Sequence, residues 1–152
     1  MASIRMNVGM AVITACVLAG GCSSMETQVG QEPAKSLYQR LGEKPAITAV
    51  VDQFVANVAN DGRINQRFAT TDILTLKKHL VEQVCRASGG PCTYTGRDMK
   101  TTHAGMRITT ADFNALVEDL VAALNQFKVP EREKKELLGL LSPMKKDIVE
   151  LR

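Results

Sequence analysis

The chain has 152 residues, of which 45% are hydrophobic and 23% charged, and its formal net charge is +3. This balance is typical of one globular domain and excludes a disordered or fibrous chain. Lys and Arg are interspersed with Asp and Glu, and aromatic residues make up only 4%. Composition therefore argues against a nucleic-acid partner, which would require a basic patch or an aromatic platform for bases.

The first residues are typical of an export signal. Arg5 precedes an uncharged apolar stretch at 8–19 that is too short to span a bilayer as a helix. Small residues then precede Cys22, which resembles a bacterial lipoprotein signal in which this cysteine is lipidated. Ordinary signal cleavage near the same place is the alternative. We predict a signal at 1–21, a flexible polar tether at 22–35 and a domain at 36–152, anchored by lipid in the bacterial cell envelope and facing the periplasm.

Two cysteines remain once Cys16 and Cys22 are assigned to the signal and the lipid. These are Cys85 and Cys92, which flank a Gly-Gly-Pro sequence at 89–91. In an oxidising compartment such a pair can form a disulfide, and the spacing alone leaves open whether it does.

Four segments repeat apolar residues at helical spacing, and they cover residues 45–58, 72–88, 109–127 and 130–151. Asp72 is a candidate N-cap, Thr109 and Asp112 form a capping-box pattern, and Pro143 interrupts the last segment. We predict an all-α domain, with bundle and globin-like packing both open. The polar, glycine-bearing stretch at 93–108 is typical of a functional loop.

The chain has two histidines. His103 lies four residues after Met99 and three before Met106, so one or two helical turns would place all three on one side. A neutral imidazole is a good iron ligand, and methionines suit a flat macrocycle. On spacing alone, the commoner interpretation of His103 is a histidine that bonds a nearby carbonyl. His79 lies at the inward edge of the second segment, and its commoner interpretation is a boundary histidine beside two lysines.

Motifs spread over residues 36–149 resemble those of the group I truncated haemoglobins. They are SLYQRLG at 36–42, VDQF at 51–54, RF at 67–68, GGP at 89–91 and YTGRDM at 94–99, followed by His103, Gly105 and Ile108. The resemblance implies a two-over-two helical sandwich around one non-covalent haem b. It also implies that His103 is the proximal iron ligand, on a helix reduced to a loop and one turn, with Gly89, Gly90 and Gly96 supplying bends.

The resemblance also implies the residues that contact the haem. They are Phe54, Val55, Phe68, Leu76, Leu80, Val84, Met99 and Ile108. Val55 stands where group I members usually have a tyrosine that donates to the bound ligand, and Leu76 and Leu80 replace common polar groups. Gln83 is the remaining amide donor. The loss of these hydrogen-bond donors disfavours NO dioxygenase activity, and we expect that the protein is not an enzyme.

His79 matches the position from which some group I members place a second imidazole on the iron. We therefore expect a six-coordinate haem held by His103 and His79, which exchanges electrons with an unidentified redox partner or acts as a sensor. One alternative is a five-coordinate haem that reversibly binds O2, NO or CO. Another is a helical lipoprotein without haem. The chain has no CxxCH motif for covalent attachment.

Overall fold

The computed structural model describes residues 34–151. The predicted signal at 1–21, Cys22 and nearly all of the predicted tether lie outside these residues. Within the described range every regular element is a helix, and the one β-bridge, between Thr109 and Leu151, is isolated. The all-α prediction is confirmed. None of the helices in this range is long and apolar enough to cross a membrane.

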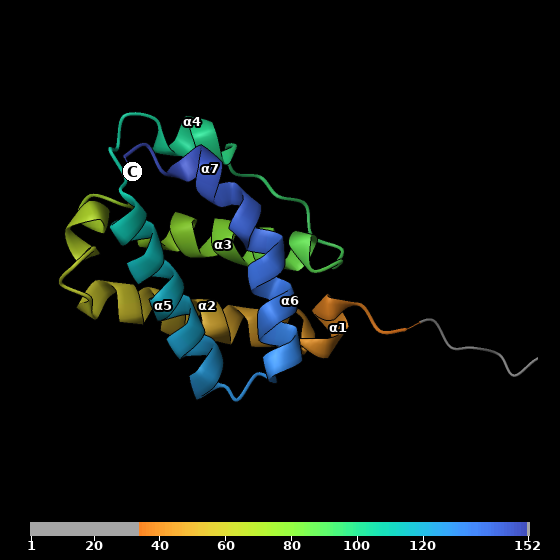
Figure 1. Cartoon of the computed structure of the whole chain (residues 1–152). Coiled ribbons are helices and arrows are strands. Elements are labelled where there is room, and N and C mark those ends of the chain that lie inside the picture. Colours follow the sequence, from red (N-terminus) through yellow and green to blue (C-terminus); the bar gives the residue numbers. More distant parts are fainter. Residues whose placement is uncertain (1–33, 152) are drawn as a thin grey trace, which may run out of the picture. The chain divides into compact units, whose positions relative to one another are not determined.

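The elements follow one another as shown in Figure 1: α1 Leu37–Arg40, α2 Glu43–Asn60, the 3-10 turn η1 Asn65–Phe68, α3 Ile73–Ala87, α4 Met99–His103, α5 Thr110–Gln126, α6 Glu131–Leu141, the 3-10 turn η2 Ser142–Met144 and α7 Lys145–Ile148. Helix α2 packs on both α3 and α5, and α3 also contacts α6. The short helices α4 and α7 lie side by side. Two long helices thus face two others, with α4 and α7 at one end of the arrangement.

The predicted helix ends are largely those observed. The Asp72 carboxylate accepts hydrogen bonds from the first turn of α3, and Thr109 and Asp112 form the capping box of α5. Pro143 lies in η2, which separates α6 from α7. Helix α5 ends at Gln126, slightly before the predicted bound, because the chain turns at Lys128, where φ is +54°.

The core lies where the long helices meet. Leu124 of α5 and Leu137 of α6 are each 1% exposed, and they pack in one cluster with apolar residues of α2 and α3. Full burial of such a side chain stabilises the fold by about 1.5–3 kcal/mol. The core therefore fixes the four long helices independently of α4.

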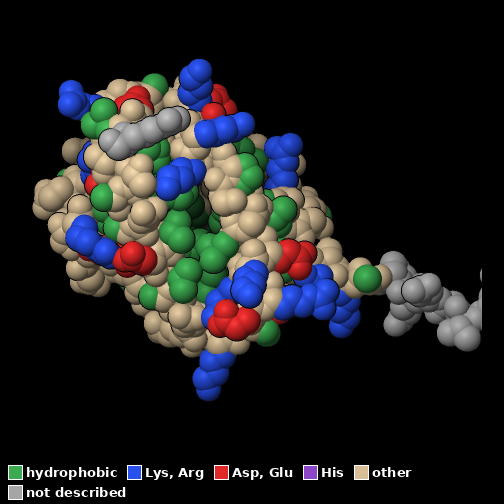
Figure 2. Space-filling model, viewed as in Figure 1, with side chains coloured by type: hydrophobic (Ala, Val, Ile, Leu, Met, Phe, Trp, Pro, Cys, Tyr) green, Lys and Arg blue, Asp and Glu red, His purple; other side chains and the backbone are tan. Residues whose placement is uncertain are grey.

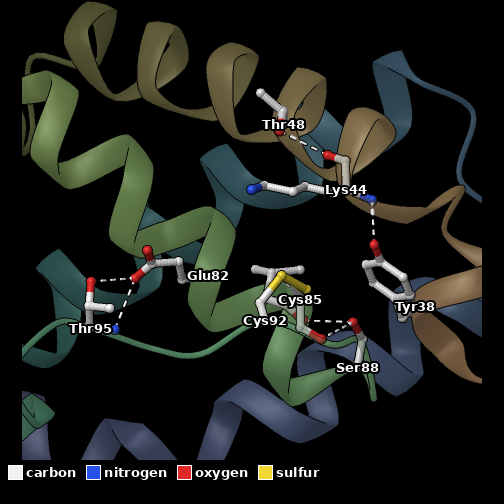
Figure 3. Close-up of a disulfide and its surroundings, with 9 residues drawn as sticks. Tyr38, Lys44, Thr48, Glu82, Cys85, Ser88, Cys92 and Thr95 are labelled. Carbon is white, nitrogen blue, oxygen red and sulfur yellow. Dashed lines mark hydrogen bonds between the residues drawn. A yellow bond between two sulfur atoms is a disulfide. The ribbon is translucent and has the colours of Figure 1, made fainter.

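A disulfide joins Cys85, near the end of α3, to Cys92 in the following loop, with the two Cα atoms 5.8 Å apart (Figure 3). Of the glycines between them, Gly89 has a φ of +85°, as a bend requires. Gly90 is required for packing instead, because a Cβ there would lie 2.5 Å from the Tyr38 ring and 2.7 Å from the Cys85 sulfur. Bends were predicted at both Gly89 and Gly90, and of these two only Gly89 has a positive φ.

Removal of the disulfide should destabilise the domain. The double variant Cys85→Ala/Cys92→Ala releases a short closed loop in the unfolded chain, and we expect the free energy of unfolding to fall by about 2–3 kcal/mol. Urea unfolding followed by circular dichroism measures the change. The control is Thr93→Ala, an exposed position in the same loop, which should shift stability by less than about 0.5 kcal/mol. Equal unfolding midpoints for the double variant and the wild type would contradict this expectation.

Candidate functional site

A cavity of about 1010 Å³ lies among α2, α3, α5 and the segments from α6 to α7. Figure 2 shows apolar side chains around a hollow between α5 and the α6–α7 segment. The volume is at the upper end of the usual range for small-molecule and cofactor sites. All but one of the predicted contact residues line it, namely Phe54, Val55, Phe68, Leu76, Leu80, Val84 and Met99.

Two predicted positions lie elsewhere. Ile108 is buried but is not among the residues that line the cavity, and its carbonyl accepts hydrogen bonds from the N–H groups of Glu150 and Leu151. Its contact with the cofactor stays a prediction. Met106 lies beyond the end of α4 and is 42% exposed, so it does not share a face with Met99 and His103.

The opposite wall was not predicted. It is formed by the inward faces of α5, η2 and α7 and by the end of α6, and includes Phe113, Leu116, Leu120, Leu141, Met144 and Ile148. Helical periodicity identifies most of these residues as inward-facing. Periodicity does not distinguish an apolar face that meets another helix from one that lines a cavity.

The helix that carries His103 is one turn long, as expected. The side chain of Asp98 caps α4 by accepting from the N–H of Thr101 at 2.9 Å. His103 lines the cavity, and its Nδ1 lies 2.7 Å from the carbonyl oxygen of Met99. A proton on Nδ1 donates to this carbonyl and leaves the lone pair on Nε2, which is the usual arrangement around a metal-binding histidine.

The segment after His103 is fastened to the segment that follows α7. The Glu150 carboxylate accepts from the N–H of Gly105 at 2.6 Å and from that of Arg107. Both residues have positive φ values, +78° and +53°. These bonds hold an irregular backbone in place directly after the histidine.

A second clamp joins this segment to α5. Arg67, in η1, donates to the carbonyl of Met106 at 2.9 Å and to the Asp112 carboxylate at 2.7 Å. Asp112 also accepts from the N–H and hydroxyl of Thr109. The N–H of Thr109, and then its hydroxyl and the Arg67 guanidinium, lower the pKa of Asp112 against the effect of burial. The carboxylate thus stays charged where η1, α5 and the segment after His103 meet.

His79 lines the same cavity from α3. Its ring lies edge-on to that of Tyr94, with the centroids 6.0 Å apart and an angle of 62° between the planes. Tyr94 donates from its hydroxyl to the carbonyl of Arg97 at 2.8 Å. Burial, followed by the charges of Glu82 and Asp98, raises the pKa of Tyr94, so that the phenol remains protonated and able to donate.

The side-chain amide of Gln83 contacts the sulfur atoms of two methionines. Its Nε2 donates to Met144 Sδ at 3.0 Å and to Met99 Sδ at 3.6 Å. Met99 is the residue whose carbonyl holds His103, so this amide lies toward the α4 side of the cavity. The sequence left Gln83 as a candidate donor to a bound ligand, and the structure instead places its N–H groups against two thioethers.

The donor set fits a metal that arrives with ligands of its own. Among residues 34–151, no group of three or more His, Cys, Asp or Glu side chains could hold a bare ion. His79 and His103 line this wide apolar cavity, and an imidazole there could hold an iron whose remaining ligands a macrocycle would supply. The residues present therefore fit haem.

Comparisons with known proteins agree with this geometry. The bacterial-like globin family model matches residues 36–150. The group 1 truncated haemoglobin of Mycolicibacterium paratuberculosis is 37% identical over 117 residues, which is 77% of this chain and 85% of that protein.

Solved structures show the same arrangement of helices. The truncated haemoglobin of Tetrahymena pyriformis in its Fe(III) form superposes with a TM-score of 0.73 at 29% identity, over 76% of this chain and 98% of that one. The 2/2 haemoglobin of Synechococcus, which carries covalently attached haem, gives 0.71 at 28% identity over the same shares. The predicted two-over-two fold is confirmed.

Neutralising Asp112 should weaken the domain in a pH-dependent way. Its folded pKa is lowered, so the carboxylate stabilises the native state above the ordinary carboxyl pKa, and this contribution is lost as pH falls through the folded value. We expect Asp112→Asn to lose about 1 kcal/mol near neutral pH, as for other caps, and the deficit to shrink below about pH 4. Urea unfolding over this range tests the difference, with the exposed Asp147→Asn as control. A deficit independent of pH would contradict the assignment.

Proposed function

This chain belongs to the bacterial-like globin family, and we propose that it is a haem protein in which His103 and His79 both hold the iron. The observation that carries the proposal is that the chain's two histidines line one apolar cavity from different helices, α4 and α3. Haem supplies an iron that changes oxidation state and binds diatomic gases. The protein supplies the ligands, their orientation and an apolar shell.

Each histidine has a separate role in this proposal. The contact of His103 Nδ1 with the Met99 carbonyl supports the tautomer that ligates through Nε2, and with it the role of His103 as the proximal ligand. His79 is the second ligand. Two imidazoles stabilise the low-spin ion in both oxidation states, which favours electron exchange with a redox partner, or sensing, over gas storage.

Reversible binding of O2, NO or CO by a five-coordinate haem is the second candidate. The apolar residues Val55, Phe68, Leu76 and Leu80 favour it, since all line the cavity. None of them can donate a hydrogen bond to a bound ligand. Such a pocket favours fast ligand release and disfavours NO dioxygenase activity.

We propose that the haem is haem b and is held without a covalent bond, unlike that of the Synechococcus structure. His79 and His103 are both assigned to the iron, and Cys85 and Cys92 are joined to each other. Among the described residues, this leaves no free thiol or third imidazole to attack a vinyl group.

We also propose that the domain is exported to the cell envelope and anchored through lipid on Cys22. The apolar stretch at 8–19, followed by small residues and this cysteine, supports an exported lipoprotein. The disulfide between Cys85 and Cys92 also supports export, because such bonds persist in oxidising compartments. The proposed protein would then meet its ligand or redox partner outside the cytoplasm.

The visible spectrum of the purified protein tests the ligands. The ferric wild type should be low-spin, and His79→Ala should convert it almost completely to a high-spin or water-bound form with haem retained. His103→Ala should lower haem content severalfold, with partial recovery on addition of imidazole.

The matched control for these variants is Leu74→Ala, on the same helix as His79 but 81% exposed, which should leave the spectrum unchanged. A high-spin wild type would favour the five-coordinate candidate. A folded but colourless wild type that takes up no added hemin would refute haem binding.

Fractionation of cells that express the full chain tests the anchor. Wild type should sediment with membranes and gain the mass of a lipid on a chain that begins at residue 22, whereas Cys22→Ser should lose both properties. Ser23→Ala, the adjacent position, is the control. Recovery of an unmodified wild-type chain in the soluble fraction would contradict lipidation and favour ordinary cleavage.

A further inference from the structure

The contact between His79 and Tyr94 lies at the wall of the haem cavity. Both residues line the cavity, and their rings meet edge to face with the centroids 6.0 Å apart. His79 belongs to α3, whereas Tyr94 belongs to the loop between α3 and α4. An imidazole at the edge of a helix can also turn toward solvent, and a ring contact at the cavity wall favours the inward orientation over the outward one.

The loop that carries Tyr94 is fastened to α3 on both sides of this residue. Before it, Cys92 is bonded to Cys85. After it, Thr95 donates from its N–H and its hydroxyl to the Glu82 carboxylate at 2.9 and 2.8 Å (Figure 3). Tyr94 is therefore held on the same helix that carries His79, so the two rings have little freedom to separate.

The orientation of the Tyr94 ring is also fixed from within the loop. Its hydroxyl bonds the Arg97 carbonyl at 2.8 Å, and the ring lies directly on Gly96. A Cβ at position 96 would lie 2.4 Å from the phenol oxygen and 2.5 Å from Cζ. Gly96 is thus needed for close approach of the ring, and not for the bend that the sequence suggested, because its φ is not positive.

We propose that Tyr94 is a positioning residue for His79, which holds the imidazole at the cavity wall and so raises the fraction of haem iron that His79 ligates. The inference rests on the proposed function. An edge-to-face ring pair changes such an equilibrium by about two- to tenfold. Tyr94 does not touch the iron and acts only by restricting its neighbour.

The affinity of the haem-loaded protein for CO measures this effect even when the wild type is fully six-coordinate. His79 competes with CO for the iron, so a weaker internal ligand gives a proportionally higher apparent CO affinity. We expect Tyr94→Leu to raise that affinity by about two- to tenfold and to lower the low-spin fraction. Tyr94→Phe, which keeps the ring, and Thr93→Ala, in the same loop, should each change it by less than about twofold.

A double-mutant cycle separates the contact from a general change in the pocket. In a His79→Ala background, Tyr94→Leu should leave CO affinity unchanged, because no internal ligand remains to be positioned. Gly96→Ala, which displaces the ring without removing it, should change affinity in the same direction as Tyr94→Leu. It serves as the deciding variant if Tyr94→Leu does not fold.

The remaining outcomes distinguish two failures. If His79→Ala alters the spectrum but Tyr94→Leu or Gly96→Ala leaves CO affinity unchanged or lowers it, the positioning role is overturned and the proposed ligation stands. The positioning role is also overturned if Tyr94→Leu changes CO affinity as much in the His79→Ala background as in the wild type. It is likewise overturned if Tyr94→Phe changes CO affinity as much as Tyr94→Leu does. If His79→Ala leaves the spectrum unchanged, both the ligation and the positioning role are overturned.

Discussion

The site depends on a helix that could not form alone. Helix α4 has five residues, well below the length at which an isolated helix is stable in water. It persists because Asp98 caps its first turn, because it packs beside α7, and because His103 bonds the carbonyl of Met99. The last contact is internal to α4, and a proton on Nδ1 would leave Nε2 free to bind a metal. One contact thus supports both the short helix and the orientation of the His103 ring.

Local rules in the sequence were sufficient to predict the long helices and much of the cavity. Asp72 and the pair Thr109 and Asp112 have the side chains that satisfy free N–H groups at a helix start, and they begin α3 and α5. Pro143 lacks an N–H and interrupts the last segment. These features act within a few residues, so they can be read without knowledge of the fold. The histidine roles, in contrast, required a resemblance that extended over the whole domain.

The remaining features depend on contacts between distant residues. Ile108 was predicted to contact the cofactor, but the cavity lining does not include it, and its carbonyl pairs with backbone N–H groups more than forty positions away. Gln83 could have faced a bound ligand, and two methionine sulfurs from other helices attract its amide instead. Tyr94 was visible as part of a motif, but its contact with His79 arises from the loop's attachment to α3. No local pattern encodes these partners.

The bonds between Glu150 and the segment after His103 join two parts of the chain that lie far apart in sequence. The N–H groups of Gly105 and Arg107 and the carbonyl of Ile108 find their partners only in residues 150 and 151. The four long helices meet in a core that includes none of these residues, whereas the backbone after His103 depends on them. The backbone directly after His103 is therefore closed by residues more than forty positions later in the chain.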